Sequence, residues 1–154
     1  MTIDNEMLGQ IISRYKGAYF TVNRRLNAMI RERMPDGLTV DQYSTLLCLR
    51  ESGVSTTSEL ADTFCVGKSS ITAIIQRLFD KQLIVRQADE HDRRVTLLTL
   101  TEEGMHITDQ IEGSIQELIA TFMNQFDEQE AMAFIETFEK LAKAMAQSME
   151  TERS

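Results

Sequence analysis

The chain contains 154 residues, enough for one domain or for a small domain with additional helices. Hydrophobic residues make up 42% of it and charged residues 26%, a composition that supports a packed core and argues against a disordered chain. The formal net charge is −8, but residues 1–55 hold seven basic and six acidic side chains, residues 56–100 six of each, and residues 101–154 three basic and twelve acidic ones. The acidity therefore belongs to the last third, and a local basic patch elsewhere is compatible with binding phosphate.

Membrane, metal and catalytic patterns are absent from the sequence. No apolar run approaches the ~18 residues of a membrane span, and the acidic first ten residues lack the layout of a signal peptide, so we expect a cytoplasmic protein without a membrane partner. Cys48 and Cys65 are too few for a disulfide framework and lie far from His91 and His106, which argues against a metal site. With no Ser-His-Asp, Cys-His, phosphate-loop or paired-carboxylate pattern, we expect no catalytic residues, no cofactor and a protein that is not an enzyme.

Long amphipathic helices are predicted at both ends of the chain. Between residues 5 and 33, apolar side chains recur at alternating steps of four and three, the spacing of a coiled-coil seam. After Thr101, a helix with a similar stripe extends to about Phe126, and Asp127 with Glu130 begins a last one. A monomer of this size would struggle to cover these apolar faces, so we expect a homodimer built from the terminal helices.

Two shorter helices are predicted between these ends. Thr39 and Gln42 form a capping box at the start of one helix, and Gly53 ends it. Thr56 and Glu59 form a second capping box, which begins a short helix with a narrow apolar face.

A third helix and a hairpin follow directly. Residues 65–67 make a tight connection to a helix at Lys68–Lys81, after which the hydrophobic period changes. Residues 83–86 are predicted as a strand, residues 89–94 as a charged hairpin tip, and residues 95–100 as the returning strand. Two short helices joined by a tight turn and followed by a hairpin are typical of a winged helix-turn-helix.

The predicted fold class is therefore mainly α with a small β-hairpin wing, in one domain over residues 1–154. Its parts are the helix-turn-helix at about 57–80, the wing at 83–100, the winged-helix lobe that contains both at 38–100, and the flanking dimerisation helices at 1–34 and 102–154.

The helix at Lys68–Lys81 has two different faces. An Ile/Leu stripe at i, i+3, i+4 and i+7 predicts the inward face. The opposite face carries Ser69, Thr72, Ala73, Gln76 and Arg77, which are mostly small or hydrogen-bonding. Such a face fits the major groove of DNA, whereas a solvated surface is the competing interpretation. Lys68, Ser69 and Ser70 occupy the first turn, where a phosphate is favoured.

The hairpin tip carries two adjacent arginines, Arg93 and Arg94. Arginines on a narrow finger are suited to the electronegative minor groove. Pairing with the acidic residues of the same turn is the competing interpretation.

Four segments in this order resemble a MarR-type transcriptional regulator. They are T-S-E-L-A-D-T-F-C-V-G-K-S-S-I-T-A-I-I-Q-R-L at Thr57–Leu78, K-Q-L-I-V-R at Lys81–Arg86, D-E-H-D-R-R at Asp89–Arg94 and L-T-L-T-E-E-G at Leu98–Gly104. The resemblance extends over nearly the whole chain, because the flanking helices also follow the family order. It implies a winged-helix homodimer that binds a pseudo-palindromic operator in double-stranded DNA.

The resemblance also assigns roles to individual residues. The family positions that contact bases and phosphates are matched by Ser69, Ser70, Thr72, Gln76 and Arg77, with Lys68 in the same first turn. Arg94 matches the wing-tip arginine, Asp92 the acid that orients it, and Arg86 a position where the wing strands face the DNA backbone; Arg93 lies beside them. One position departs from the family, which has Gly where Gln82 stands; a left-handed turn there would strain glutamine by roughly 1 kcal/mol.

The expected function is that of a sequence-specific DNA-binding transcriptional regulator, a repressor released by a small aromatic molecule or by an oxidative signal. The alternative is a helical protein-interaction module that has the winged-helix fold but does not bind DNA. The zero net charge of the middle segment and the acidic end would suit such a module.

The sequence offers two kinds of candidate residue for sensing the signal, a cluster that could bind an effector and a cysteine that could be oxidised. Tyr15, Tyr19 and Phe20 could form the wall of an effector cleft with Arg14 as a cationic anchor, and buried packing is the alternative. Cys65, in the turn before the predicted recognition helix, is the better candidate for a redox-sensitive thiol, because Cys48 lies in an apolar helix segment.

Overall fold

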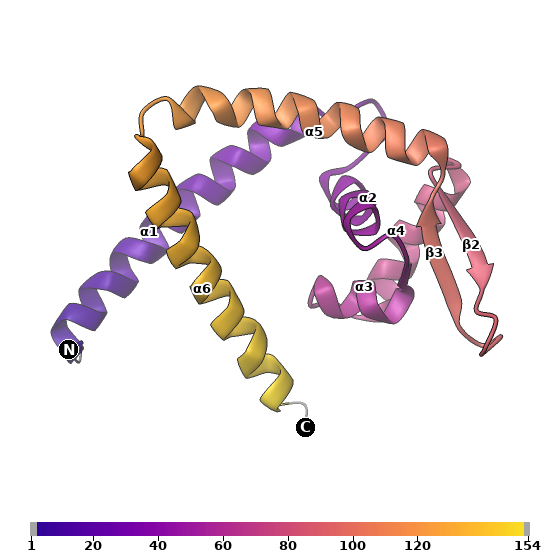
Figure 1. Ribbon diagram of the computed structural model, residues 1–154, viewed down its shortest axis with the longest axis horizontal. Coiled ribbons are helices and arrows are strands. Elements are labelled where there is room, and N and C mark those ends of the chain that lie inside the picture. Colours follow the sequence, from indigo (N-terminus) through magenta and orange to yellow (C-terminus); the bar gives the residue numbers. More distant parts are fainter. Residues whose placement is uncertain (1–2, 153–154) are drawn as a thin grey trace. The chain divides into compact units, whose positions relative to one another are not determined.

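The computed structural model describes residues 3–152, and contacts divide the chain into two compact units, one up to Ile115 and one from Gln116 onward. Within the described residues, the first unit contains helices and a small antiparallel sheet, and Figure 1 shows the β2–β3 hairpin (residues 84–100) at the edge of this unit with α4 (Lys68–Asp80) beside it. The predicted fold class, mainly α with a β wing, is confirmed. No helix in residues 3–152 is long and apolar enough to cross a membrane.

Helix α1 (Asn5–Arg31) begins at Asp4, whose carboxylate accepts a hydrogen bond of 2.8 Å from the backbone N–H of Met7. It ends two residues before the predicted boundary and buries none of its residues. The apolar seam is exposed along most of its length; Ile12 and Tyr19, for example, retain 47% and 52% of their accessible surface. Apart from the stacking of Tyr15 on Tyr19, this seam presents apolar surface to solvent.

The two capping boxes form as predicted. At the start of α2 (Val40–Ser52), Thr39 and Gln42 exchange both bonds, and Gly53 ends the helix with φ of 77°. At the start of α3 (Thr57–Thr63), Thr56 and Glu59 do the same at 3.1 Å in each direction. Each box satisfies backbone donors that a helix start would otherwise leave without partners.

The sheet has one strand more than the predicted hairpin. Strands β2 (Ile84–Ala88) and β3 (Thr96–Leu100) pair antiparallel, and the short β1 (Ser55–Thr56) pairs with β3, with Ser55 opposite Leu98. The order is therefore β1-β3-β2. Two residues are too few for a hydrophobic alternation, which is why the sequence did not reveal β1.

The apolar stripe of α4 (Lys68–Asp80) lies in the core of the first unit. Ile71, Ile75 and Leu78 keep at most 3% of their surface, while α4 contacts α2, α3 and β2. The core cluster comprises Leu38, Tyr43, Leu46, Leu49, Leu60, Ala61, Ile71, Ile75, Leu78, Leu83, Ile84, Leu98, Ile111 and Ile115. Because this stripe faces inward, the opposite side of α4 must face solvent.

Helix α5 (Glu102–Met123) is attached to the lobe at its first turns. The hydroxyl oxygen of Thr101 accepts from the backbone N–H of Gly104 at 2.9 Å, as expected for a cap. A Cβ at Gly104 would lie 2.0 Å from the carbonyl oxygen of Leu83, so only glycine permits this approach.

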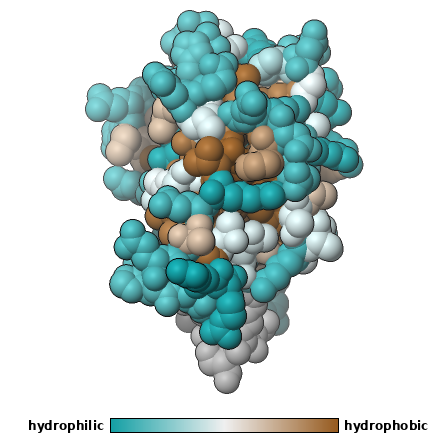
Figure 2. Space-filling view, turned by 90° about the vertical axis from the view of Figure 1, so that its right-hand side faces the viewer, coloured by the Kyte–Doolittle hydropathy of each residue, from teal (hydrophilic) through white to brown (hydrophobic). Residues whose placement is uncertain are grey.

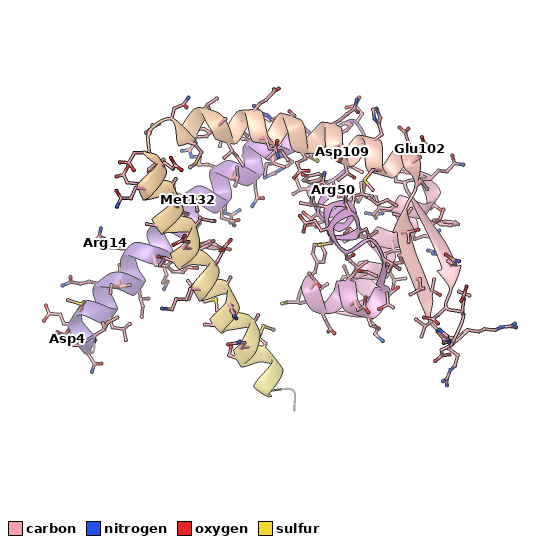
Figure 3. All side chains as sticks on the ribbon, in the orientation of Figure 1. Asp4, Arg14, Arg50, Glu102, Asp109 and Met132 are labelled. Carbon is pink, nitrogen blue, oxygen red and sulfur yellow. The ribbon has the colours of Figure 1, made fainter. Side chains whose placement is uncertain are left out.

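An ion-pair group joins α2 to α5. Figure 3 shows Arg50 on α2 beside Asp109 on α5. The guanidinium and the carboxylate are 2.7 Å apart, and Glu112 pairs with the same arginine. The hydrogen bond to Asp109 is the main reason that the pKa of Arg50 is raised.

Helix α6 (Glu128–Glu152) begins with the predicted pair Asp127 and Glu130, which form another reciprocal cap. Its apolar stripe is exposed, with Phe138 stacked on Phe134 at 5.6 Å between ring centroids. Like α1, α6 presents an apolar face that the described residues do not cover.

Gln82 has the left-handed backbone that the resemblance implied, because the family has Gly at this position, and its φ is 60°. We expect Gln82→Gly to raise the free energy of unfolding by up to about 1 kcal/mol, because glycine adopts this conformation without a Cβ clash. Urea denaturation measures the change. The matched control is Gln87→Gly in β2, where φ is not positive and glycine should instead weaken the strand. Equal destabilisation by both substitutions would contradict the assignment of strain to Gln82.

Candidate nucleic-acid interface

The polar residues predicted for the outer face of α4 are exposed to solvent. Ser69, Thr72, Gln76 and Arg77 are exposed, as are Lys68 and Ser70 in the first turn. Gly67 precedes the helix and supplies no side-chain cap, and the backbone N–H of Ser70 donates to its carbonyl oxygen at 3.2 Å. The N–H groups of Lys68 and Ser69, at the very start of the helix, are therefore the ones open to a ligand. The Thr72 hydroxyl donates to the carbonyl oxygen of Lys68 at 2.7 Å, which leaves its oxygen available as an acceptor.

Arg86 connects the wing to this face. It lies on β2, and its Nη2 donates to Oε1 of Gln76 at 2.8 Å, while Nε2 of Gln76 donates to Oδ1 of Asp80 at 2.8 Å. The Arg86 guanidinium also lies 4.5 Å from the ring centroid of Phe79. Neither Asp80 nor Phe79 was predicted from the sequence, and the step of four from Gln76 to Asp80 was the available signal.

A hydrogen-bonded turn shapes the tip of the wing. One carboxylate oxygen of Asp89 accepts from the backbone N–H groups of His91 and Asp92 at 2.7 and 3.3 Å. The backbone N–H of Asp89 donates to the carbonyl oxygen of Val95 at 3.0 Å and closes the loop. Arg93 is exposed in this loop, so the turn itself projects the basic side chains.

Arg94 is held by Asp92 in the arrangement that the resemblance implies. Oδ1 of Asp92 accepts from the backbone N–H of Arg94 at 3.0 Å and from Nε at 3.1 Å, and Oδ2 accepts from Nη2 at 3.3 Å. The Arg94 side chain still keeps 91% of its surface. These hydrogen bonds, the side-chain ones first, lower the pKa of Asp92.

Figure 2 shows the side of the molecule on which β2 and β3 lie. Hydrophilic side chains occupy most of this view and surround a smaller hydrophobic area near its middle. Among the apolar side chains of this lobe, Val85 and Phe79 are 44% and 40% exposed. The surface is therefore suited to a polar partner more than to an apolar one.

A cleft of about 450 Å³ lies between α1 and the start of α2. Of the predicted effector residues, Tyr19 and Phe20 line it, whereas Tyr15 stacks on Tyr19 at 5.9 Å and Arg14 lies farther toward the N-terminus (Figure 3). The cationic residues in the lining are Arg24, whose guanidinium lies 5.6 Å from the Phe20 ring, and Arg31. The remaining lining residues are Asn23, Asn27, Val40 and Asp41.

The two cysteines lie in different environments. Cys65 is exposed in the turn before α4, with φ of 54°. Cys48 is half-buried in α2, and burial, followed by the charge of Glu51, raises the pKa of its thiol. No group of three or more His, Cys, Asp or Glu residues in the described part of the chain could hold a metal ion.

The lobe and its exposed polar helix define a winged helix-turn-helix protein. The model of the MarR family matches residues 38–96. The HTH-type transcriptional repressor MdtR of Bacillus subtilis is 30% identical over 116 residues, which are 75% of this chain and 75% of MdtR. The transcriptional regulator MhqR of the same organism is 30% identical over 94 residues, 61% of this chain, and the match spans 63% of MhqR.

Solved structures agree with these matches. A MarR family protein from Bacillus stearothermophilus has a TM-score of 0.78 at 23% identity, covering 94% of this chain and 99% of that one. A cysteine-to-serine mutant of MarR from E. coli, solved in complex with operator DNA, has a TM-score of 0.69 at 23% identity, covering 92% and 99%. The chain belongs to the MarR family, as the sequence resemblance indicated.

The lowered pKa of Asp92 gives a direct test of the wing-tip pair. A carboxyl carbon NMR titration should place the Asp92 midpoint below the ordinary aspartate value of about 3.9. The contact is then complete above that pH and is lost as the pH falls through the lowered pKa. Arg94→Ala should move the midpoint back upward, while Arg93→Ala should leave it in place. An ordinary midpoint in the unmodified protein would show that the pair is absent in solution.

Proposed function

We propose that the protein is a sequence-specific DNA-binding transcriptional regulator in which α4 enters the major groove and the wing tip the minor groove. The observation that carries this proposal is the exposed polar face of α4 opposite the buried Ile71, Ile75 and Leu78, on the same lobe as the exposed Arg94. A groove admits one helix, and its base edges are read by polar side chains that project from that helix. Membership of a family whose relatives are named as regulators supports it.

The residues divide into two kinds of contact. The start of α4, which has no side-chain cap, is suited to bind a DNA phosphate, because free N–H groups and the helix dipole attract an anion there. The residues at this position are Lys68, Ser69 and Ser70. Thr72, Gln76 and Arg77 lie farther along the same face and suit base edges. Arg93 and Arg94 suit the minor groove, and Asp92 limits the conformations of Arg94 before DNA arrives.

The active form would be a homodimer on a pseudo-palindromic operator. Exposed apolar side chains on α1 and α6, such as Ile12 and Phe138, support this assembly, because burial of apolar surface drives association. Two copies of α4 would then meet successive major grooves about one turn, roughly 34–36 Å, apart. An effector that binds more tightly to a dimer with a different spacing of the two α4 helices would disfavour the operator complex. The protein would then act as a repressor that its signal releases from DNA.

An aromatic acid is the effector that the cleft at α1 and α2 favours. Tyr19 and Phe20 offer ring surface, and Arg24 and Arg31 offer cationic groups for a carboxylate. Cys65 is the accessible thiol for an oxidative signal, whereas the raised pKa of Cys48 disfavours its reactive thiolate.

Gel shifts with the DNA upstream of the protein's own gene test the reading surface. Arg94→Ala should weaken binding to all sequences and lower the salt dependence of the affinity. Gln76→Ala and Arg77→Ala should reduce base discrimination by about 1–3 kcal/mol if the lost contact is bidentate. Gln87→Ala and Arg25→Ala, on exposed positions outside this face, serve as matched controls. Unchanged binding in all three test variants would refute the assignment of the reading surface.

The same assay separates the two signals. Phenolic acids should release the wild-type protein from DNA and should act more weakly on Phe20→Ala, while an oxidant should act on wild type and not on Cys65→Ser. Release that is identical in each variant and in wild type would place the signal elsewhere. A protein that shows no salt-dependent DNA binding at all would instead support the interaction-module alternative.

A further inference from the structure

Gln76, on the outer face of α4, is held from two sides. Its Nε2 donates to the carboxylate of Asp80, one helical turn later, at 2.8 Å. Its Oε1 accepts from Nη2 of Arg86 on β2, also at 2.8 Å. A glutamine on a solvated surface normally has many conformers, so two charged partners at opposite ends of its amide are a specific constraint.

The chemistry of these partners permits only one orientation of the amide. An ionised carboxylate only accepts hydrogen bonds, and a guanidinium only donates them. Rotation of the Gln76 amide by half a turn would place its oxygen against Asp80 and its NH2 group against Arg86, and both bonds would be lost. The charges therefore determine which end of the amide donates and which accepts.

Arg86 is itself restrained by a second contact. Its guanidinium lies 4.5 Å from the ring centroid of Phe79, a distance at which the planar cation is attracted to the ring. Phe79 is 40% exposed and belongs to α4, so this stack places a β2 side chain against the reading helix. Arg86 thus reaches Gln76 from a fixed direction.

The restrained amide has one donor and one acceptor left for DNA. A glutamine amide offers two N–H bonds and two lone pairs, and Asp80 and Arg86 use one of each. In the major groove, adenine is the base that presents an adjacent acceptor and donor, N7 and the N6 amino group, to such an amide. Guanine presents two acceptors and would leave the amide oxygen of Gln76 without a donor.

We propose that Arg86 and Asp80 are positioning residues that fix the amide of Gln76 and thereby make it select an A·T base pair at one position of each operator half-site. This inference rests on the proposed function, because it concerns how the same surface reads DNA. In this proposal Arg86 acts by orienting Gln76 and does not contact the DNA backbone itself. The proposal also explains why an acidic residue, Asp80, lies on a DNA-binding face, where its charge alone would repel DNA.

The first arm of the test uses the full-length protein without DNA. The two NH2 proton signals of Gln76, assigned by NMR, should shift in Arg86→Ala, which removes the donor to its oxygen. They should also shift in Asp80→Asn, which replaces a charged group that only accepts with a neutral amide that can also donate. Arg25→Ala, on α1, is the control and should leave them in place. The mutated side chains are exposed, and a thermal melt checks that each variant is folded. Signals that do not move in either variant would overturn the proposal before any DNA is added.

The second arm selects binding sites from a pool of randomised duplexes with wild type, Gln76→Ala, Arg86→Lys and Asp80→Asn. Arg86→Lys keeps the charge but lacks the planar fork and its stacking. All three variants should lose about tenfold discrimination at the same A·T pair. Asp80→Asn should also bind every duplex more tightly, because it removes a negative charge. Adding Arg86→Lys to Gln76→Ala should cost no further discrimination.

The outcomes separate this inference from the proposed function. Arg86→Ala is carried through the same site selection, and its affinity is measured by gel shift over a range of salt concentrations. If it weakens binding to every sequence equally and reduces the salt dependence while sequence preference persists, Arg86 is a backbone contact and the inference is wrong. Loss of discrimination at a G·C pair would equally overturn it. In both cases the protein still selects DNA and the proposed function stands. A wild-type protein that enriches no sequence would overturn both.

Discussion

Burial of one apolar stripe on α4 is the constraint on which the rest of the lobe depends. Ile71, Ile75 and Leu78 keep at most 3% of their surface against side chains from α2, α3 and the sheet. Full burial of each such side chain contributes about 1.5–3 kcal/mol, so a rotation of α4 that exposed all three would cost several kcal/mol of stability. The direction of the polar face follows from this packing, and its side chains are not needed for the core.

Much of this lobe could be predicted because its signals are local. Each capping box involves residues three apart. The left-handed turn at Gln82 was expected for another reason, because the family that the chain resembles has Gly at that position. Other features depend on contacts between distant residues. Lys81 donates a hydrogen bond to the buried Gln42 at 3.0 Å, although the two residues are 39 positions apart. The spacing of apolar residues in the sequence cannot predict that contact. The strand β1 likewise exists only because β3 is beside it.

The candidate site, like the fold, could be predicted from the sequence only in part. The polar positions of α4 and the arginines of the wing follow from helical spacing and from the family motif, and the structure places them at the surface. The network that joins Gln76 to Asp80 and Arg86 could not be found in this way, because β2 contributes one of its members. The cleft residues Arg24 and Arg31 were missed because helix α1 has basic side chains on more than one face.

The close approach at Gly104 has a mechanical consequence. The first turn of α5 touches the root of the wing through main-chain atoms, and two hydrogen bonds reinforce it: the backbone N–H of Thr101 donates to the carbonyl oxygen of Leu83 at 3.0 Å and its hydroxyl to that of Gln82 at 2.8 Å. Main-chain contacts have no rotamers with which to absorb a displacement. A displacement of the first turn of α5 would therefore move the start of β2 with it. Residues 89–94, at the other end of the hairpin, would be displaced in turn.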